Sequence, residues 1–125
     1  MKVQLEEKGE FLIARSAESF LESGTARAFK EAVTVAVGER QRALVIDLST
    51  VREIDSSGLG ALVAILKWVR RFGGSMRVCG LQPAVREVLE LTMLHRILPL
   101  HATVEEAIEE EAARVHAGRG GSGSA

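Results

Sequence analysis

Apolar and polar residues alternate at the start of the chain in the spacing of β-strands. Val3 and Leu5 are each flanked by polar residues, and a second short apolar run covers Phe11 to Ala14. Lys8-Gly9 separates the two segments in the manner of a tight turn. The pattern predicts an opening β-hairpin.

From about Ser23 the apolar period changes from that of a strand to that of a helix. Starting at Phe29, apolar residues recur at i, i+3, i+4, i+7 and i+8, which places them on one helical face. Gly38 follows directly and predicts the end of this helix. The next segment, Ala43 to Leu48, is almost continuously apolar, as expected for a strand covered on both faces.

The remaining elements repeat this alternation. A short extended piece at Val51 to Ile54 precedes a helix from about Ser57 to Arg71, which ends at a glycine pair. Further expected elements are a strand at Met76–Cys79, a helix opened by Pro83, a short strand at Ile97–Leu100, and a last helix with a Thr103/Glu106 capping box.

The resulting order is β-β-α-β-α-β-α-β-α, which predicts an α/β fold. Single strands separated by single helices favour parallel pairing through right-handed crossovers. We therefore expect one domain over residues 1–117, with a mixed, mostly parallel sheet and helices packed on it. Residues 118–125 (GRGGSGSA) have the composition of a flexible tail or a remnant of cloning.

The composition of the chain argues against several classes of protein. The 125 residues carry a formal net charge of −1 with both signs interspersed, so no basic field favours nucleic acid or anionic lipid. Cys79 is the single cysteine and excludes a disulfide framework, which favours a reducing compartment. The longest apolar stretch, Leu59 to Leu66, is too short to cross a membrane, and no signal-peptide pattern opens the chain. We expect a soluble cytoplasmic protein without membrane insertion.

The most informative segment is the turn Asp55-Ser56-Ser57-Gly58, between an extended piece and a helix. Asp and Ser are favoured helix caps, so plain capping is one interpretation of this turn. The other interpretation is a phosphoacceptor, because a phosphate at a helix N-terminus is favoured by free N–H groups and the helix dipole. The tetrapeptide alone leaves both interpretations open.

The wider stretch IDLSTVREIDSSGLGALV resembles the signature of STAS-domain anti-sigma factor antagonists. The likeness continues through Gly73-Gly74, Val78 to Gly80, Pro83 to Val85 and a helix ending near Leu91. It extends to about Ala113 in the family's order of elements.

The resemblance implies a binding protein and not an enzyme. Such proteins bind an anti-sigma factor that is also an ATP-dependent serine kinase, and thereby free a sigma factor. Carried over, Ser56 is the residue that the kinase phosphorylates, with Ser57 the weaker candidate, and a PP2C-type phosphatase reverses the reaction. No cofactor is implied, and a monomer or weak dimer is expected. The expected partner surface comprises Asp55, Ser56, Ser57, Gly58, Leu59, Glu22 and Ser23, and the apolar pattern of the following helix adds Trp68 as a further candidate.

The loop before the first helix departs from the family pattern. Members often carry a Gly-x-Leu-Asp-like turn, whereas this chain has Ser19 in the glycine position and Glu22 in the aspartate position. The family fold places this loop beside the acceptor, so the departure bears on which partner binds. Phe20 and Leu21 are expected either in the core or at a partner contact.

The helix after the turn carries two apolar stripes, although a helix on a sheet needs only one. The second stripe contains Ala61, Ala64, Ile65, Trp68 and Phe72. Either neighbouring helices cover it, or it forms an exposed patch around Trp68 that docks a partner.

Other chemistry is weakly indicated. The spacing of His95, His101 and His116 gives no metal site, and no phosphate-binding loop, nucleophile elbow or dinucleotide fingerprint is present. One alternative keeps the fold: a STAS domain can be a non-phosphorylated regulatory subunit of a lipid-transport ABC system or a module of a sensory complex.

Overall fold

A β-hairpin opens the chain, as predicted. The computed structural model describes residues 3–124, with side chains described for residues 3–115. β1 (Val3–Lys8) and β2 (Phe11–Ser16) pair in antiparallel register. Their turn contains Gly9 with φ 63°, a left-handed conformation that glycine adopts without strain.

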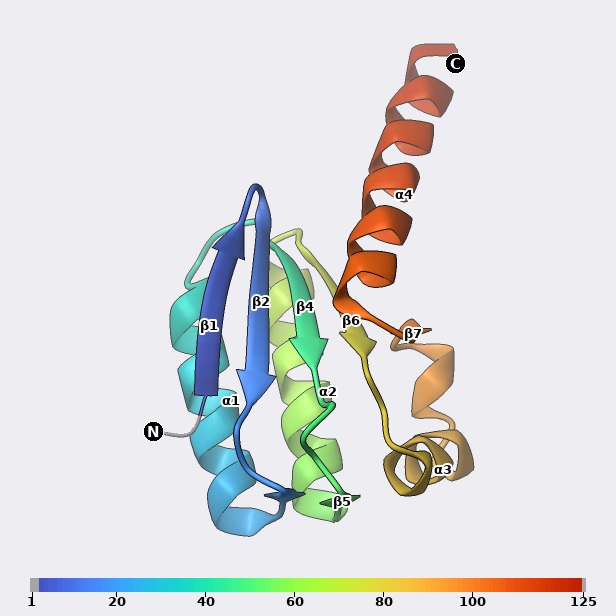
Figure 1. Cartoon of the computed structure of the whole chain (residues 1–125). Coiled ribbons are helices and arrows are strands. Elements are labelled where there is room, and N and C mark those ends of the chain that lie inside the picture. The colour runs from blue at the N-terminus through green and yellow to red at the C-terminus, as the bar shows by residue number, and fades with distance from the viewer. Residues whose placement is uncertain (1–2, 125) are drawn as a thin grey trace.

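The main sheet adds three parallel strands to this hairpin (Figure 1). They are β4 (Ala43–Asp47), β6 (Ser75–Cys79) and β7 (Leu100–His101). The strand order is β1-β2-β4-β6-β7, and only the β1–β2 pair is antiparallel. β4 lies in the centre, which explains why Leu44, Val45 and Ile46 are all buried although they point to alternate faces. The expected mixed, mostly parallel α/β sheet is confirmed.

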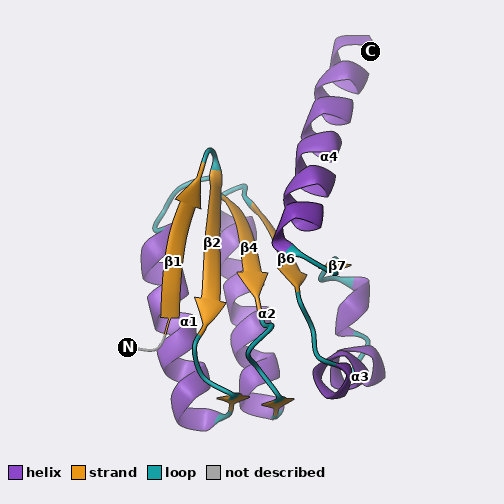
Figure 2. Cartoon of the chain, in the orientation of Figure 1, coloured by secondary structure: helices purple, strands orange, loops and turns teal. Residues whose placement is uncertain are grey.

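The helices form layers on both faces of this sheet (Figure 2). α1 (Ser23–Val37) and α2 (Ser56–Arg71) pack behind it, and α3 (Pro83–Leu91) joins their core at the β6 side. The largest buried side chains of this face include Phe29, Leu44, Ile46, Leu62, Ile65, Leu89 and Leu98.

The last helix, α4 (Val104–Ser124), lies on the opposite face and covers a smaller apolar cluster. Val104 and Ala107 pack there against Ile13, Val45 and Cys79. The Glu106 N–H donates to Thr103 Oγ1 at 3.1 Å, as the capping box predicts, but the Glu106 carboxylate accepts from Ala102 N instead of Thr103 N. The tail predicted at 118–125 lies outside the residues whose side chains the structure describes, and it stays a prediction.

Two local features were not predicted correctly. The strand expected at Ile97–Leu100 is wrong in its bounds, because β7 begins only at Leu100. A 3-10 helix, η1 (Leu94–Arg96), occupies the preceding segment, and the Ile97 N–H donates to Leu94 O at 3.0 Å. The segment therefore turns before it becomes extended.

The second feature is a two-stranded parallel sheet below the main one. β3 (Phe20–Leu21) pairs with β5 (Glu53–Ile54), which lies within the extended piece predicted at 51–54. The partner strand β3 was not predicted. This small sheet sets the position of the turn that leads into α2.

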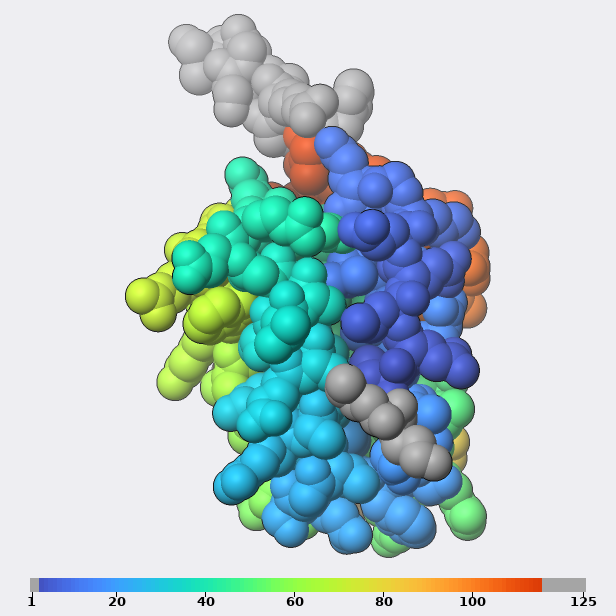
Figure 3. All heavy atoms as spheres, turned by 90° about the vertical axis from the view of Figure 1, so that its left-hand side faces the viewer, coloured from blue at the N-terminus to red at the C-terminus, as the bar shows by residue number. Residues whose placement is uncertain are grey.

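β1 forms an outer edge of the sheet, and α1 lies beside it on the surface (Figure 3). Leu5 of β1 and Val35 of α1 are exposed along this side. The edge strand also carries Glu6, Glu7 and Lys8, charges that oppose pairing with a further strand.

Candidate functional site

The turn between β5 and α2 is capped by Asp55, not by a serine. One carboxylate oxygen of Asp55 accepts from Ser57 N at 2.9 Å and from Gly58 N at 3.1 Å. Because Asp55 has extended backbone and Ser56 is helical, α2 begins one residue earlier than predicted. The capping interpretation is therefore confirmed for Asp55, while the two serines are left for another role.

Ser56 and Ser57 occupy the first two positions of α2, and both residues are exposed. Among the described residues, no side-chain hydrogen bond that orders this turn uses either hydroxyl. A phosphate on Ser56 would lie near the positive end of the helix dipole and beside the Asp55 carboxylate. It would change the surface charge here from −1 to about −3 without removing the cap.

Gly58 holds the turn by close packing. A Cβ on this residue would lie 2.5 Å from Leu21 O and 2.5 Å from Ile54 Cγ1, closer than real atoms approach. Gly58 is helical and buried, without a positive φ. Its function is to let α2 approach β3 and β5. Gly60, two residues on, has open space where its Cβ would be.

The atypical loop around Glu22 lies beside this turn. The Asp55 N–H donates to Leu21 O at 3.2 Å, and the Arg52 N–H donates to Ser19 O at 2.7 Å. Glu22 is the residue before α1, and its N–H donates to Thr25 Oγ1 at 3.0 Å. Leu21 is fully buried in the core, whereas Phe20 is 41% exposed, so a partner contact stays a prediction for Phe20 alone.

A groove between α1 and α2 connects the loop to the serines. It has a volume of about 310 Å³ and includes Ser23 and Ser57 on opposite sides. Arg27 and Lys30, one turn apart on α1, line the same groove. Sequence reasoning missed these two cations; their i, i+3 spacing was visible, but nothing in the chain indicated which face α1 turns toward α2.

Trp68 does not join this site. Its indole N–H donates to Gly38 O at 2.9 Å, and its ring lies 5.2 Å from that of Phe72. The twelve residues from Ser56 to Trp68 span roughly 18 Å along the helix, at about 1.5 Å per residue. α1 covers much of the second stripe, with Ala61 and Ile65 buried, so coverage by a neighbouring helix is the observed alternative.

The described residues contain no cluster of His, Cys, Asp and Glu that could hold a metal ion. His101 is buried beside Arg77, its Nε2 2.9 Å from Arg77 Nη1. Cys79 is buried, and burial raises the pKa of its thiol to about 12. Within the same part of the chain, no helix is both long and apolar enough to cross a bilayer.

Comparison with known proteins agrees with this architecture. The family model described as "STAS domain" matches residues 2–107. An "Anti-sigma F factor antagonist" of Paenibacillus polymyxa is 29% identical over 114 residues, covering 88% of this chain and 96% of that protein.

Solved structures with the same fold include an anti-sigma factor antagonist from Mycobacterium paratuberculosis. It has a TM-score of 0.77 at 29% identity, and the match covers 86% of this chain and 91% of that one. The anti-sigma factor antagonist SpoIIAA in its unphosphorylated form has a TM-score of 0.72 at 21% identity, with 89% and 96% covered. The Bacillus SpoIIAA in its phosphorylated form has a TM-score of 0.64 at 20% identity, with 86% and 97% covered. At these last two identities the likeness concerns the fold alone.

The family model covers most of the chain, and it includes the sheet, the β3–β5 pair and the whole of the Asp55–Gly58 turn. The protein therefore belongs to the STAS domain family.

Proposed function

We propose that this protein is an anti-sigma factor antagonist switched by phosphorylation of Ser56. Unphosphorylated, it binds an anti-sigma serine kinase and frees a sigma factor; phosphorylated, it releases the kinase. The observation that carries the proposal is the position of Ser56, exposed at the first turn of α2 and outside the hydrogen bonds of the cap. The relatives named as anti-sigma factor antagonists support the partner class.

The geometry explains how one phosphate can change binding and leave the fold intact. Asp55 caps α2 and Gly58 packs it against β3, and neither depends on the Ser56 hydroxyl. A phosphate adds about −1.5 to −2 charges with three acceptor oxygens. A partner surface shaped for a neutral hydroxyl would then face a dianion beside the Asp55 carboxylate.

The proposed contact surface is centred on this turn. It takes in Asp55, Ser57 and Leu59 from the start of α2, and Glu22 and Ser23 from the adjacent loop. The groove between α1 and α2 supports this extent, because Ser23 and Ser57 line it together. A contribution of Trp68 stays a separate prediction, since its indole is used within the fold.

The decisive experiment is the intact mass of the protein from its native host, before and after treatment with a PP2C-type phosphatase. We expect one phosphate, mapped to Ser56. An unmodified protein, or a phosphate mapped elsewhere, would contradict the proposal.

Binding of the host's anti-sigma kinases to immobilised variants gives the second readout. Ser56→Ala should retain the kinase and resist phosphorylation, whereas Ser56→Asp should lose it. Ser57→Ala is the matched control, and we expect it to be phosphorylated and to bind like the natural protein. If Ser56→Ala and Ser56→Asp bind one partner equally, the protein is a constant subunit, as in the transport or sensory alternative.

A further inference from the structure

A second feature lies at the opposite end of α2, away from Ser56. A hollow of about 510 Å³ forms where four elements converge. Its walls are the last turns of α2, the start of β6, η1 with the residues after it, and the inner side of α4. None of its lining residues belongs to the Asp55–Gly58 turn, so an inference about it does not depend on the proposed function.

The charges of this hollow are strongly unbalanced. Its lining contains four arginines and one carboxylate, which leaves three uncompensated positive charges in a chain whose net charge is −1. His95 adds a further basic group. We call this site the cationic hollow; its charged lining is Arg70, Arg77, His95, Arg96, Glu111 and Arg114.

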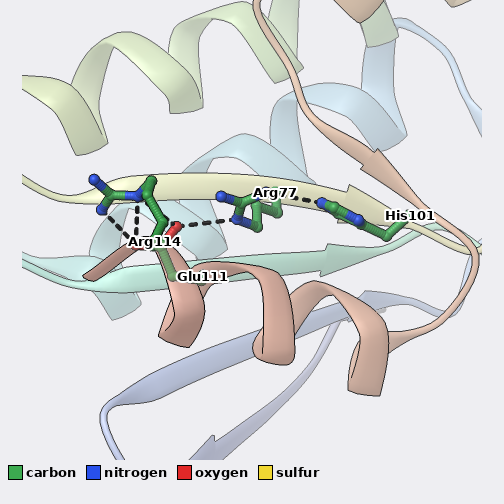
Figure 4. A network of polar contacts seen from close by, with 4 residues as sticks. All are labelled: Arg77, His101, Glu111 and Arg114. Atoms are coloured by element: carbon green, nitrogen blue, oxygen red, sulfur yellow. Dashed lines mark hydrogen bonds and ion pairs between the residues drawn. The ribbon is translucent and has the colours of Figure 1, made fainter. Parts of the chain in front are cut away.

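The single carboxylate, Glu111, holds two of the arginines in place (Figure 4). Its side chain is 4% exposed and accepts from Arg77 Nε at 3.0 Å and from Arg114 Nη2 at 2.5 Å. Burial raises the pKa of Glu111, but the hydrogen bonds from Arg114 and Arg77 outweigh it, so the pKa is lowered and the group stays ionised. The two guanidinium groups are thus fixed by a buried anion instead of moving freely in solvent.

The other two arginines have no such compensation. Neither Arg70 nor Arg96 forms an ion pair within the part of the chain that the structure describes. They come from α2 and η1, two elements far apart in sequence, yet both line the same hollow. Like charges gathered in one concavity repel one another, so an anion bound there would be favoured.

A neighbouring hollow has the opposite balance of charge. It shares Glu111 and Arg114 with the first but lies on the β1–β2 side, with a volume of about 500 Å³. Its charged lining is Glu7, Glu10, Glu111, Arg42 and Arg114, so acids exceed bases by one. Of the two hollows that share Glu111 and Arg114, the one on the α2–β6–η1 side carries the excess of positive charge.

We propose that the cationic hollow binds a small phosphorylated anion. Guanidinium groups match phosphate oxygens in bidentate pairs, and several groups converging on one concavity suit a multiply charged phosphate better than a single carboxylate. The volume falls within the usual range for small-molecule sites. The bound anion would bridge α2, η1 and the Glu111–Arg114 turn of α4, and so hold α4 on the sheet.

Isothermal titration calorimetry of the full chain with inorganic pyrophosphate, at low ionic strength, tests the proposal. We expect saturable binding that weakens as salt is raised. Arg70→Gln and Arg96→Gln should each weaken it about tenfold, because an exposed, unpaired cation is removed from the lining and no packing is lost. Arg71→Gln is the matched control, the next residue of α2 and outside the hollow, and it should bind as the natural protein does.

The outcomes of this titration and two further comparisons make the result decisive. Equal losses in Arg70→Gln and Arg71→Gln, or no saturable binding at low salt, would overturn the proposal. Citrate binding as tightly as pyrophosphate would overturn the phosphate class. Phosphatidylcholine vesicles with and without a phosphoinositide test the other phosphate source. If the protein binds pyrophosphate and also binds the vesicles that contain the phosphoinositide but not those without it, the hollow accepts a phosphorylated lipid headgroup.

Discussion

The two ends of α2 are held by different means. At the N-terminal end, backbone N–H groups, the Asp55 carboxylate and the bare Cα of Gly58 position the turn, while the serine side chains stay exposed. At the C-terminal end, the contacts come from side chains. The Trp68 indole N–H donates to the backbone oxygen of Gly38 at the end of α1, and the buried Glu111 pairs with Arg77 and so links α4 to β6. Exposed residues at the first end are therefore available to a partner, whereas substitutions of Trp68 or Glu111 near the second end mainly affect the fold.

The largest effect is expected for Gly58→Val. Its side chain cannot fit within 2.5 Å of a backbone carbonyl, so α2 must move away from β3. We expect a loss of about 4 kcal/mol in the free energy of unfolding, a large part of the stability of a small domain. Urea denaturation measures it. Gly60→Ala is the control, with open space around its Cβ, and should stabilise α2 by up to about 1 kcal/mol. Equal effects at the two glycines would refute the close approach.

The second largest effect on stability is expected near the C-terminal end of α2. Glu111→Ala leaves Arg77 buried without its anion, and we expect a loss of about 3 kcal/mol at neutral pH. Because the pKa of Glu111 is lowered on folding from its ordinary 4.5, its contribution is fully present above that value and is lost as the pH falls. Urea denaturation between pH 7 and pH 3 should show a shallower acid dependence for the variant. Glu110→Ala, exposed on the same helix, should leave the curve unchanged.

Trp68→Ala should cost about 2 kcal/mol, since the ring is half-buried between α1 and α2 and loses its bond to Gly38 O. Trp68→Phe separates the packing of the ring from its hydrogen bond, because it removes the N–H and keeps an aromatic ring. This variant should cost about 1 kcal/mol. Thermal unfolding gives both values. Kinase binding per folded molecule should stay unchanged; a weaker affinity at unchanged stability would instead show that Trp68 contacts the partner.

Asp55→Ala removes the cap of α2 and should cost about 1 kcal/mol. Asp55→Asn keeps an acceptor oxygen without the charge, so most of the stability should return. Chemical denaturation distinguishes the three proteins. A cost near zero for Asp55→Ala would mean that the β3–β5 pairing alone positions the turn.

The smallest effect is expected for Ser56→Ala, whose hydroxyl takes no part in the cap. Its free energy of unfolding should lie within about 0.5 kcal/mol of the natural value. Any change in kinase binding by Ser56 variants can then be attributed to the interface. A large destabilisation, measured by the same urea titration, would contradict the separation between the two ends of α2.

The spacing of apolar residues along the chain predicted most of the fold, because each strand and helix buries a face that its own sequence determines. Phe29, Val33 and Val37 illustrate this on α1, where the stripe expected from the spacing is the buried one. β3 escaped prediction because two residues carry no period, and its pairing with β5 depends on a segment more than thirty residues away. The bounds of β7 were missed because Ile97, apolar and β-branched, lies in a turn that Met93 sets with a left-handed φ of 65°.

The local structure of the turn at the start of α2 was also predicted in part. The residue types of the Asp55–Gly58 turn predicted a helix start capped by Asp or Ser, and Asp55 is the cap, but the packing role of Gly58 was not predicted. Gly58 shows why: its role comes from a contact with Leu21 O, which depends on tertiary structure and has no local signal. The convergence of Arg70, Arg96 and Arg114 on one hollow likewise depends on how α2, η1 and α4 meet.

The single thiol of the chain offers a kinetic probe. Cys79 is 1% exposed, and α4 covers its side of β6. With the pKa of the thiol at about 12, alkylation of the native state at pH 8 should be very slow. Each labelling event then records an opening in which α4 lifts from the sheet. The alkylation rate thereby reports the local opening equilibrium of one helix, without any introduced label.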